Sequence, residues 1–338
     1  MSRSISQLAA PRRLARACGR ILAVALPALA ACQSAGDGLA PQEGGGVAAP
    51  AADHAPATAE PLGTLVTNRI VYSVYTADGG TDIWTMDPQG GSQAHLTSFT
   101  GLTGWEYNPS WSFDHQRIAF EKRRSGYTTD IYLMNADGSK KGWARSATYA
   151  ESIDMPSWSP DRTNLLVRVS YQQNLVLGRI DLASGNLSLV APQGVLAIRG
   201  QYPVYGPTGK TIYFIDNDFK TIKSFSPNGP LTTVYTSSPY INELALSPDG
   251  TRIAYVGALT LTNGEIYVLD LATKTTKRLT YNSALDGAPA WSPDGSRIAF
   301  HSKRSGTLQI WTMNSSTGGG LARITSRANG AGVPSWSH

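Results

Sequence analysis

Short segments of alternating apolar and polar residues recur along this chain at a spacing of 41 to 48 residues. Each begins with Pro-x-Trp-Ser or a variant of it, passes through a turn and ends in a run such as Ile298-Ala299-Phe300. A period of two is typical of a half-buried strand, and Asp-Gly suits a tight hairpin because glycine accepts a positive φ. The segments therefore predict two-stranded hairpins. The full copies are Pro109–Phe120, Pro156–Val167, Pro203–Phe214, Leu244–Tyr255 and Pro289–Phe300.

Two further strands are predicted after each hairpin. The third strand and the turn after it recur as Asp82–Gly91, Asp130–Ser139, Leu177–Asn186, Thr221–Pro230, Glu265–Lys274 and Gln309–Gly318. A fourth, shorter strand follows, as in His95–Thr97 and Lys277–Thr280. Four strands per repeat predict an all-β propeller with four-stranded antiparallel blades. One repeat position is occupied by Arg69, Arg117, Asn164, Thr211, Arg252 and Arg297, which predicts six blades.

The last copy of the motif is incomplete and lies at the end of the sequence. Pro334–His338 reads PSWSH, whereas its missing partner strand, Arg69–Tyr75, opens the repeat region. We expect the C-terminal strand to pair into the first blade and close the ring. Closure of this kind removes exposed sheet edges.

The full motif resembles the WD-like Pro-Asp repeat of the TolB β-propeller family. Pro289–Asn314, PAWSPDGSRIAFHSKRSGTLQIWTMN, carries the pattern almost completely. The third and fourth blades depart most, with Asp161-Arg162 and Thr208-Gly209 in place of Asp-Gly. The resemblance covers residues 66–338 and implies the fold; function does not follow from it, because such folds serve many roles. TolB itself also carries an N-terminal α/β domain, and here residues 32–65 stand in that place.

The N-terminal sequence resembles a bacterial lipoprotein signal. An arginine-rich start precedes the apolar run Ile21–Ala31, which is too short to span a bilayer as a helix. Leu29-Ala30-Ala31-Cys32 resembles a lipobox, which implies cleavage of residues 1–31 and lipidation of Cys32. Residues 32–65 are rich in Ala, Gly and Pro and predict a flexible tether to a propeller at residues 66–338. The resemblance implies a cell-envelope lipoprotein, and Gln33 after the cysteine favours the outer membrane, facing the periplasm.

Charge and cysteine content remove several classes of function. Of the 29 basic residues, five arginines lie in residues 1–32, and 24 basic and 24 acidic residues remain. A nucleic-acid partner needs a basic face, so the overall charge does not support one. Cys18 falls in the predicted signal and Cys32 is the predicted lipid site, which leaves no disulfide and no thiol chemistry. We expect a monomer attached to a membrane by its lipid.

A candidate binding site is the channel rim formed by loops that enter the innermost strands. Loops on a rigid scaffold commonly carry recognition, and Tyr and Trp are frequent anchors. The alternative is ordinary loop polarity. The rim residues form a polar, mildly acidic ring, and they are Trp105, Glu106, Tyr107, Asn108, Asp154, Gln201, Tyr202, Tyr240, Asn242, Glu243, Asp286 and Asn329.

Other conspicuous residues have structural interpretations. Trp111, Trp158, Trp291 and Trp336 occupy one repeat position and are expected to pack between blades. Arg124 and Arg304 are expected in hairpins. Asp216-Asn217-Asp218 offers oxygen ligands of the kind that calcium prefers, but lies between two strands and predicts a turn.

No enzyme signature stands out. There is no Gly-x-Ser-x-Gly elbow, and the histidines form no metal-spaced pair. Oligogalacturonate lyases have a related propeller with a histidine-rich metal site that these residues do not reproduce. The leading interpretation is a non-catalytic module, without cofactor or metal, that binds an envelope protein or polysaccharide. The alternative is a carbohydrate-active lyase or glycosidase that uses rim carboxylates among Glu106, Asp154 and Asp286. A scaffold that works through its outer blade surfaces is a third possibility.

Overall fold

Twenty-four strands and no helix make up the part of the chain that the structure describes. The computed structural model describes residues 67–98, 105–123, 128–145, 152–171, 174–192, 194–195, 197–226, 229–260 and 263–337. All of them belong to one compact unit, 51–338. The signal, Cys32, the tether and the predicted boundary at residue 65/66 lie outside the described residues and stay predictions.

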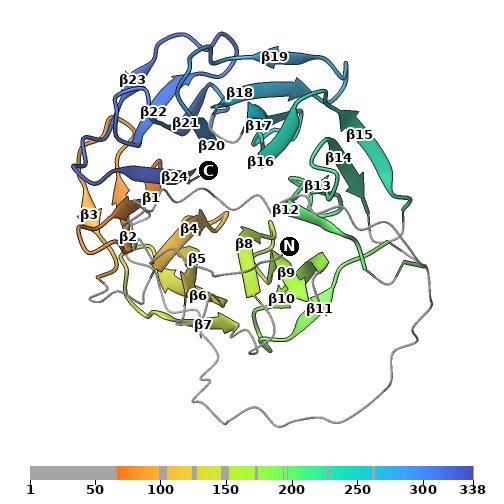
Figure 1. Cartoon of the computed structure of the whole chain (residues 1–338). Coiled ribbons are helices and arrows are strands. Elements are labelled where there is room, and N and C mark those ends of the chain that lie inside the picture. The colour runs from red at the N-terminus through yellow and green to blue at the C-terminus, as the bar shows by residue number, and fades with distance from the viewer. Residues whose placement is uncertain are drawn as a thin grey trace, which may run out of the picture. The chain divides into compact units, whose positions relative to one another are not determined.

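The strands form repeated antiparallel groups of four, arranged around a centre (Figure 1). Four groups are separate sheets. From the innermost strand outward they are β8 (Ser152–Trp158), β9 (Asn164–Tyr171), β10 (Asn174–Asp181) and β11 (Leu187–Leu189); β12 (Gly200–Tyr205), β13 (Ile212–Asp216), β14 (Thr221–Phe225) and β15 (Thr232–Thr236); β16 (Tyr240–Leu246), β17 (Arg252–Thr260), β18 (Asn263–Asp270) and β19 (Thr276–Arg278); and β20 (Asp286–Trp291), β21 (Arg297–Ser302), β22 (Gln309–Asn314) and β23 (Ala322–Arg323).

The other eight strands are joined in a single sheet, so five sheets are present where six separate blades were expected. One half contains β24 (Ala331–Trp336), β1 (Ile70–Tyr75), β2 (Thr81–Met86) and β3 (Ala94–His95). The other half contains β4 (Trp105–Trp111), β5 (Arg117–Arg123), β6 (Thr129–Asn135) and β7 (Gly142–Arg145). One parallel residue pair, Thr81 with Trp105, joins the halves, and every other strand pair in the sheet is antiparallel. The sheet is therefore two four-stranded blades linked at one point.

The C-terminal strand closes the ring, as predicted. β24 pairs with β1 in antiparallel register, with Ile70 opposite Trp336 and Val74 opposite Ala331. Beyond the strands, the Ser337 N–H donates to the Arg69 carbonyl over 2.8 Å. The first blade thus takes its innermost strand from the end of the chain.

Apolar clusters lie between blades rather than within them. Trp158 packs with Ala119 and Ile131 of the blade before its own, and Trp291 packs in the same way with Ala254 and Ile266 of the blade before its own. The four repeat tryptophans are at most 4% exposed, which confirms their predicted packing role. Six such clusters occur among the described residues, and each joins two neighbouring blades.

The predicted hairpins use the expected turn chemistry, even where the sequence departs from Asp-Gly. In four blades a serine hydroxyl donates to the turn aspartate, as from Ser292 to Asp294 over 2.6 Å. Arg162 and His115 adopt the left-handed conformation that Gly295 has at the same turn position, with φ of 62°, 60° and 68°. The turn is therefore preserved without glycine.

Candidate functional site: the channel and its rim

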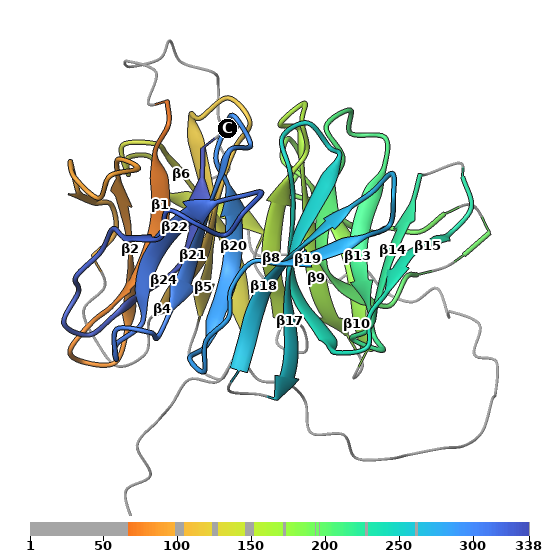
Figure 2. The ribbon, with the colours of Figure 1, turned by 90° about the horizontal axis from the view of Figure 1, so that it is seen from above.

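The six innermost strands run in the same direction around a central channel (Figures 1 and 2). Their first residues gather at one face, the rim, and the Pro-Asp turns gather at the opposite face, the hairpin face. In Figure 2 the arrowhead of β17 marks the rim, and the opposite face is the hairpin face. A cavity of about 240 Å³ is lined by all six strands. Its walls include Asn108–Trp111, Met155–Trp158, Tyr202–Tyr205, Glu243–Leu246, Ala288–Trp291 and Val333–Trp336.

A ring of left-handed residues surrounds this cavity. One residue in each innermost strand has φ between 48° and 56°, and the strand register shifts at or beside it. None is glycine, although the left-handed conformation costs an L-residue about 1–2 kcal/mol. Bulges and backbone strain of this kind are common at binding sites. The residues are Asn108, Met155, Tyr202, Glu243, Ala288 and Val333.

Three of these positions are held by side chains that cross from the preceding blade. Glu121 Oε1 accepts the Met155 N–H over 2.7 Å, and Glu243 Oε2 accepts the Ala288 N–H over 2.6 Å. His301 Nδ1 accepts the Val333 N–H over 3.3 Å. These polar side chains therefore link neighbouring blades around the channel.

Burial changes the acidity of these linking groups. Burial, and next the charge of Asp154, raise the pKa of Glu121 to about 7. Burial raises the pKa of Glu243, and burial with the charge of Lys303 lowers the pKa of His301 to about 4. His301 is therefore a neutral imidazole at neutral pH, which agrees with its acceptor role at Nδ1. The channel lining holds groups that resist ionisation.

Gly287 gives these groups room. A Cβ at Gly287 would lie 2.4 Å from His301 Nε2 and 2.9 Å from Glu243 Oε2. Either contact is shorter than packed atoms tolerate, so any larger residue would displace the buried imidazole and carboxyl.

The predicted rim residues fall into two groups. Glu106, Gln201 and Asp286 are 4%, 3% and 0% exposed, so the expectation that they line an open rim is wrong. Each of these three side chains is instead enclosed, because it has partners within its own or a neighbouring blade. The other predicted residues keep some exposure: Trp105, Tyr107, Asn108, Asp154, Tyr202, Asn242 and Glu243 are half-buried, and Tyr240 and Asn329 are exposed. Their role in binding stays a prediction.

The three candidate catalytic carboxylates are each paired with a basic side chain. Arg168 binds Asp154 through two hydrogen bonds of 2.7 and 2.6 Å. Glu106 lies 3.2 Å from Lys122 Nζ. Asp286 accepts from the guanidinium of Arg304 over 2.6 Å.

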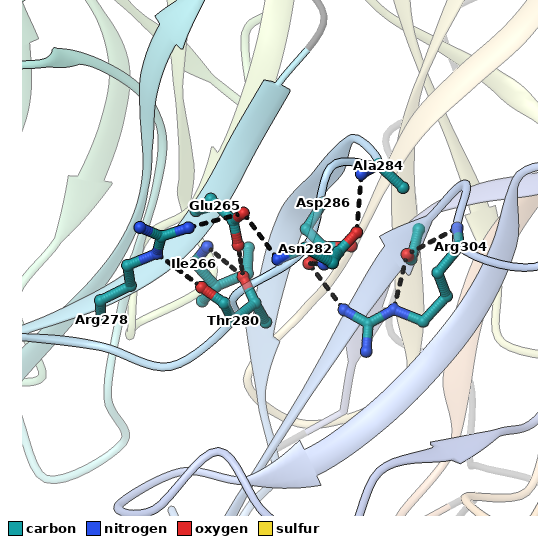
Figure 3. Close-up of polar contacts among 9 residues, drawn as sticks. Glu265, Ile266, Arg278, Thr280, Asn282, Ala284, Asp286 and Arg304 are labelled. Carbon is teal, nitrogen blue, oxygen red and sulfur yellow. Dashed lines mark hydrogen bonds and ion pairs between the residues drawn. The ribbon is translucent and has the colours of Figure 1, made fainter.

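The network around Asp286 extends to a rim loop (Figure 3). Asn282 Nδ2 donates to Asp286 Oδ2 over 2.7 Å, while the Asn282 N–H donates to Glu265 Oε1 over 3.0 Å. Glu265 also accepts from Arg278 and from the Thr280 hydroxyl, over 2.9 and 2.5 Å. The loop between β19 and β20 is therefore held at Asn282, near its middle, by two buried carboxylates.

Arg304 lies in a hairpin turn, as predicted, but has a second role that its motif did not indicate. Its guanidinium lies over the rings of Phe300 and Trp311 at 5.2 Å while it binds Asp286. The other arginine of this motif, Arg124, lies outside the described residues. Asp216-Asn217-Asp218 forms the predicted turn, in which Asp218 Oδ1 accepts the N–H groups of Lys220 and Thr221.

Sequence reasoning missed Glu121 and Arg168, and it considered His301 only as a metal ligand. All three occupy one repeat position, directly after the Ile-Ala-Phe segment, where β13 and β17 have Ile215 and Val256. Polar residues at a position that is apolar in other repeats were the available signal.

No group of three or more His, Cys, Asp or Glu side chains that could share a metal ion occurs within the described ranges. Within the same ranges, no helix has the length and apolar character needed to cross a bilayer. His54 and His338 lie outside the described residues.

Comparison with known proteins agrees with the fold. The family described as the TolB beta propeller domain matches residues 232–338. An uncharacterized protein of Agrobacterium fabrum is 29% identical over 188 residues, which cover 54% of this chain and 62% of that protein. The Tol-Pal system protein TolB of Alcanivorax borkumensis is 38% identical over 76 residues, which cover 22% of this chain and 18% of that protein. The chain spans less than two thirds of the length of either relative.

A solved structure extends the likeness to most of the chain. TolB from Acinetobacter baumannii superposes with a TM-score of 0.68 at 20% identity, covering 80% of this chain and 66% of that chain. At this identity the likeness shows the fold alone.

Proposed function

Because this chain is a TolB-like β-propeller, we propose that it is a non-catalytic binding module of the cell envelope, anchored by a lipid on Cys32. The site is the rim of the channel, and the ligand is an envelope protein or polymer. A relative named as a Tol-Pal system protein supports an assembly role in the envelope.

The observation that carries this proposal is the pairing of the rim carboxylates. A glycosidase needs one carboxyl as acid and a second as base or nucleophile, both free to act. Here Asp154, Asp286 and Glu106 are each held by a basic side chain at 2.6 to 3.2 Å. Such pairing disfavours proton transfer by these carboxylates and so favours recognition over catalysis.

One observation favours the alternative of a carbohydrate-active enzyme. Glu121 has a pKa of about 7 beside the charged Asp154, which resembles the acid–base pairs of glycosidases. Its Oε1, however, already accepts from Asn108 Nδ2 over 2.6 Å and from the Met155 N–H. Turnover of polygalacturonate or a nitrophenyl glycoside that disappears in Asp154→Asn would contradict a binding-only role.

The rim can be tested by capture with matched variants. We expect full-length protein, cross-linked in cells, to retain envelope partners that the double variant Trp105→Ala, Tyr240→Ala loses by about tenfold, since aromatic anchors carry much of a binding energy. Trp143→Ala is the control, because Trp143 is 49% exposed on the outermost strand β7. Loss in the control with retention in the rim variant would assign binding to the blade edges instead.

The proposed lipid anchor on Cys32 can be tested separately. Cys32→Ala is expected to move the protein from the membrane fraction to the soluble fraction, because two or three acyl chains bind a bilayer far more strongly than the peptide that carries them. Immunoblots of fractionated cells and incorporation of a clickable palmitate would measure this. Cys18→Ala, in the predicted signal, is the matched control and should change neither readout.

A further inference from the structure

The carboxylates near the rim do not make it acidic. Asp154, Glu265 and Asp286 each form an ion pair of 2.6 to 2.9 Å, and Glu106 is paired at 3.2 Å. The pKa values of Glu121 and Glu243 are raised by burial, which disfavours their ionised forms. The mildly acidic ring expected from the sequence is therefore neutralised by ion pairs and by the raised pKa values of Glu121 and Glu243.

Basic side chains near the rim have fewer partners. Arg199, Lys220 and Lys303 are exposed and have no ion pair among the described residues. Asp218, exposed two residues before Lys220, is ionised because the effect of burial is outweighed by hydrogen bonds from Thr221 and Lys220 that lower its pKa, so it offsets one of these three charges. This part of the rim therefore carries an excess of uncompensated positive charge.

Exposed aromatic rings accompany these cations. Lys220 Nζ lies 5.2 Å from the ring centre of Tyr240, and the Arg278 guanidinium lies 4.6 Å from that of Tyr281. Tyr240 is 39% exposed and Tyr281 is 72% exposed. At the hairpin face, by contrast, Arg252 lies over the buried Trp291, which is 1% exposed. The contact between a cation and an aromatic ring thus belongs to the buried packing at the hairpin face. At the rim, the same kind of contact leaves the ring exposed to a partner.

The exposed aromatic and basic residues lie on one face, at the start of β16 and after β19 of the same blade, with the end of the β17–β18 hairpin between them. Tyr240 pairs with Ala258 across β16 and β17, and Ala258 pairs with Gly264, beside the start of β20. The Lys303 N–H donates to the Leu285 carbonyl, in the loop that carries Tyr281. We call this the Tyr240–Tyr281 patch; it comprises Lys220, Tyr240, Arg278, Tyr281 and Lys303.

The patch is preorganised. The loop that presents Tyr281 is tied down at Asn282 by Glu265 and Asp286 (Figure 3), and the Tyr281 hydroxyl donates to the Arg278 carbonyl over 3.0 Å. A ring held this way loses little conformational freedom on binding. Tyr and Arg are also the residues most enriched among strong contacts between proteins.

We propose that the Tyr240–Tyr281 patch binds an acidic segment of a partner protein. The carboxylates of that segment pair with Lys220 and Lys303, and its apolar groups cover the rings of Tyr240 and Tyr281. This assignment rests on the proposed function and names the chemistry of its partner.

The test uses full-length protein in detergent and three fluorescent probes. One is a 14-residue peptide with Glu at every second position and two Trp; the second has Lys in place of Glu; the third is labelled polygalacturonate. We expect only the acidic peptide to bind, and its affinity to fall as salt rises. Tyr281→Ala should weaken it roughly tenfold and Lys220→Glu roughly fivefold.

Lys210→Glu is the matched control. Lys210 is exposed in the same blade as Lys220 but lies in the turn between β12 and β13, at the hairpin face. The Lys210→Glu variant has the same change of charge as Lys220→Glu and should leave the peptide affinity unchanged. Equal loss in Lys210→Glu and Lys220→Glu would overturn the proposal, since only net charge would then matter.

The remaining outcomes separate this inference from the proposed function. Binding of polygalacturonate in place of the peptide would assign the patch to an anionic glycan and overturn the protein partner. If envelope capture depends on Trp105 and Tyr240 but the acidic peptide does not bind, only the present assignment fails. If the rim variants capture as much envelope partner as the natural protein, both the binding function of the rim and the present assignment fail.

Discussion

Removal of Val333–His338 is expected to lower the free energy of unfolding of the propeller by more than about 5 kcal/mol, a large share of the stability of a typical domain. The deletion takes away most of β24 and leaves the inner edge of β1 without its partner. It also removes Trp336, which is 4% exposed and packs with Tyr72 and Ala290. Loss of a buried tryptophan alone costs about 3–5 kcal/mol.

Thermal unfolding followed by circular dichroism measures the effect. Trp336→Ala should reproduce a large part of the loss, whereas Trp143→Ala, at an exposed position of β7, should change the melting temperature by less than about 2 °C. Added peptide Ala331–His338 should restore part of the stability of the truncated chain, because it supplies the missing strand. A truncated chain that melts like the intact one would show that β24 does not close the ring.

Ring closure could be predicted because its signals are local. The motif at the end of β24, Pro334-Ser335-Trp336, also ends β4 and β8, and Arg69–Tyr75 has the alternation of the strand that should follow it. Alternation and turn chemistry recur in every blade, so an error in one copy is corrected by the others. Departures such as Arg162 did not change the turn, because the aspartate and serine that stabilise it were retained.

The backbone of the channel could not be predicted in the same way. Met155 and Val333 each precede a proline, which normally favours an extended conformation, and a β-branched residue rarely has a positive φ. Both are left-handed in the structure. Contacts between blades decide this conformation: Glu121 and His301 accept the N–H groups of these two residues, and they come from another part of the chain.

The sequence interpretation assigned Glu106 and Asp286 to the rim and did not predict their burial, although a comparison of the repeats held the signal. Glu106 and Asp286 stand two positions before the left-handed residue, where other blades have Ile153, Ile241 and Ala331. A position that is apolar elsewhere is a buried position. The basic partners, by contrast, depend on side-chain reach across strands, which residue spacing does not give.

Glu121 is expected to make the propeller less stable as pH rises through neutrality. Burial, and then the charge of Asp154, raise the pKa of its carboxyl from 4.5 to about 7 in the folded protein. The folded state therefore holds a proton that the unfolded chain releases more readily. The resulting stabilisation is fully present below pH 4.5 and is lost as pH rises to about 7. A shift of this size corresponds to about 3 kcal/mol.

Glu121→Gln removes this dependence, because glutamine keeps an acceptor for Asn108 and Met155 without a titrating proton. At pH 8 the variant should be more stable than the natural protein by about 2–3 kcal/mol, and at pH 5 by less than about 1 kcal/mol. Urea unfolding at several pH values measures both. Asp137→Asn is the control: Asp137 is exposed, and hydrogen bonds from Ser139 lower its pKa, so its small effect has the opposite sign. Parallel pH profiles for Glu121→Gln and the natural protein would show that this carboxyl ionises normally, and that the channel lining tolerates a charge between its blades.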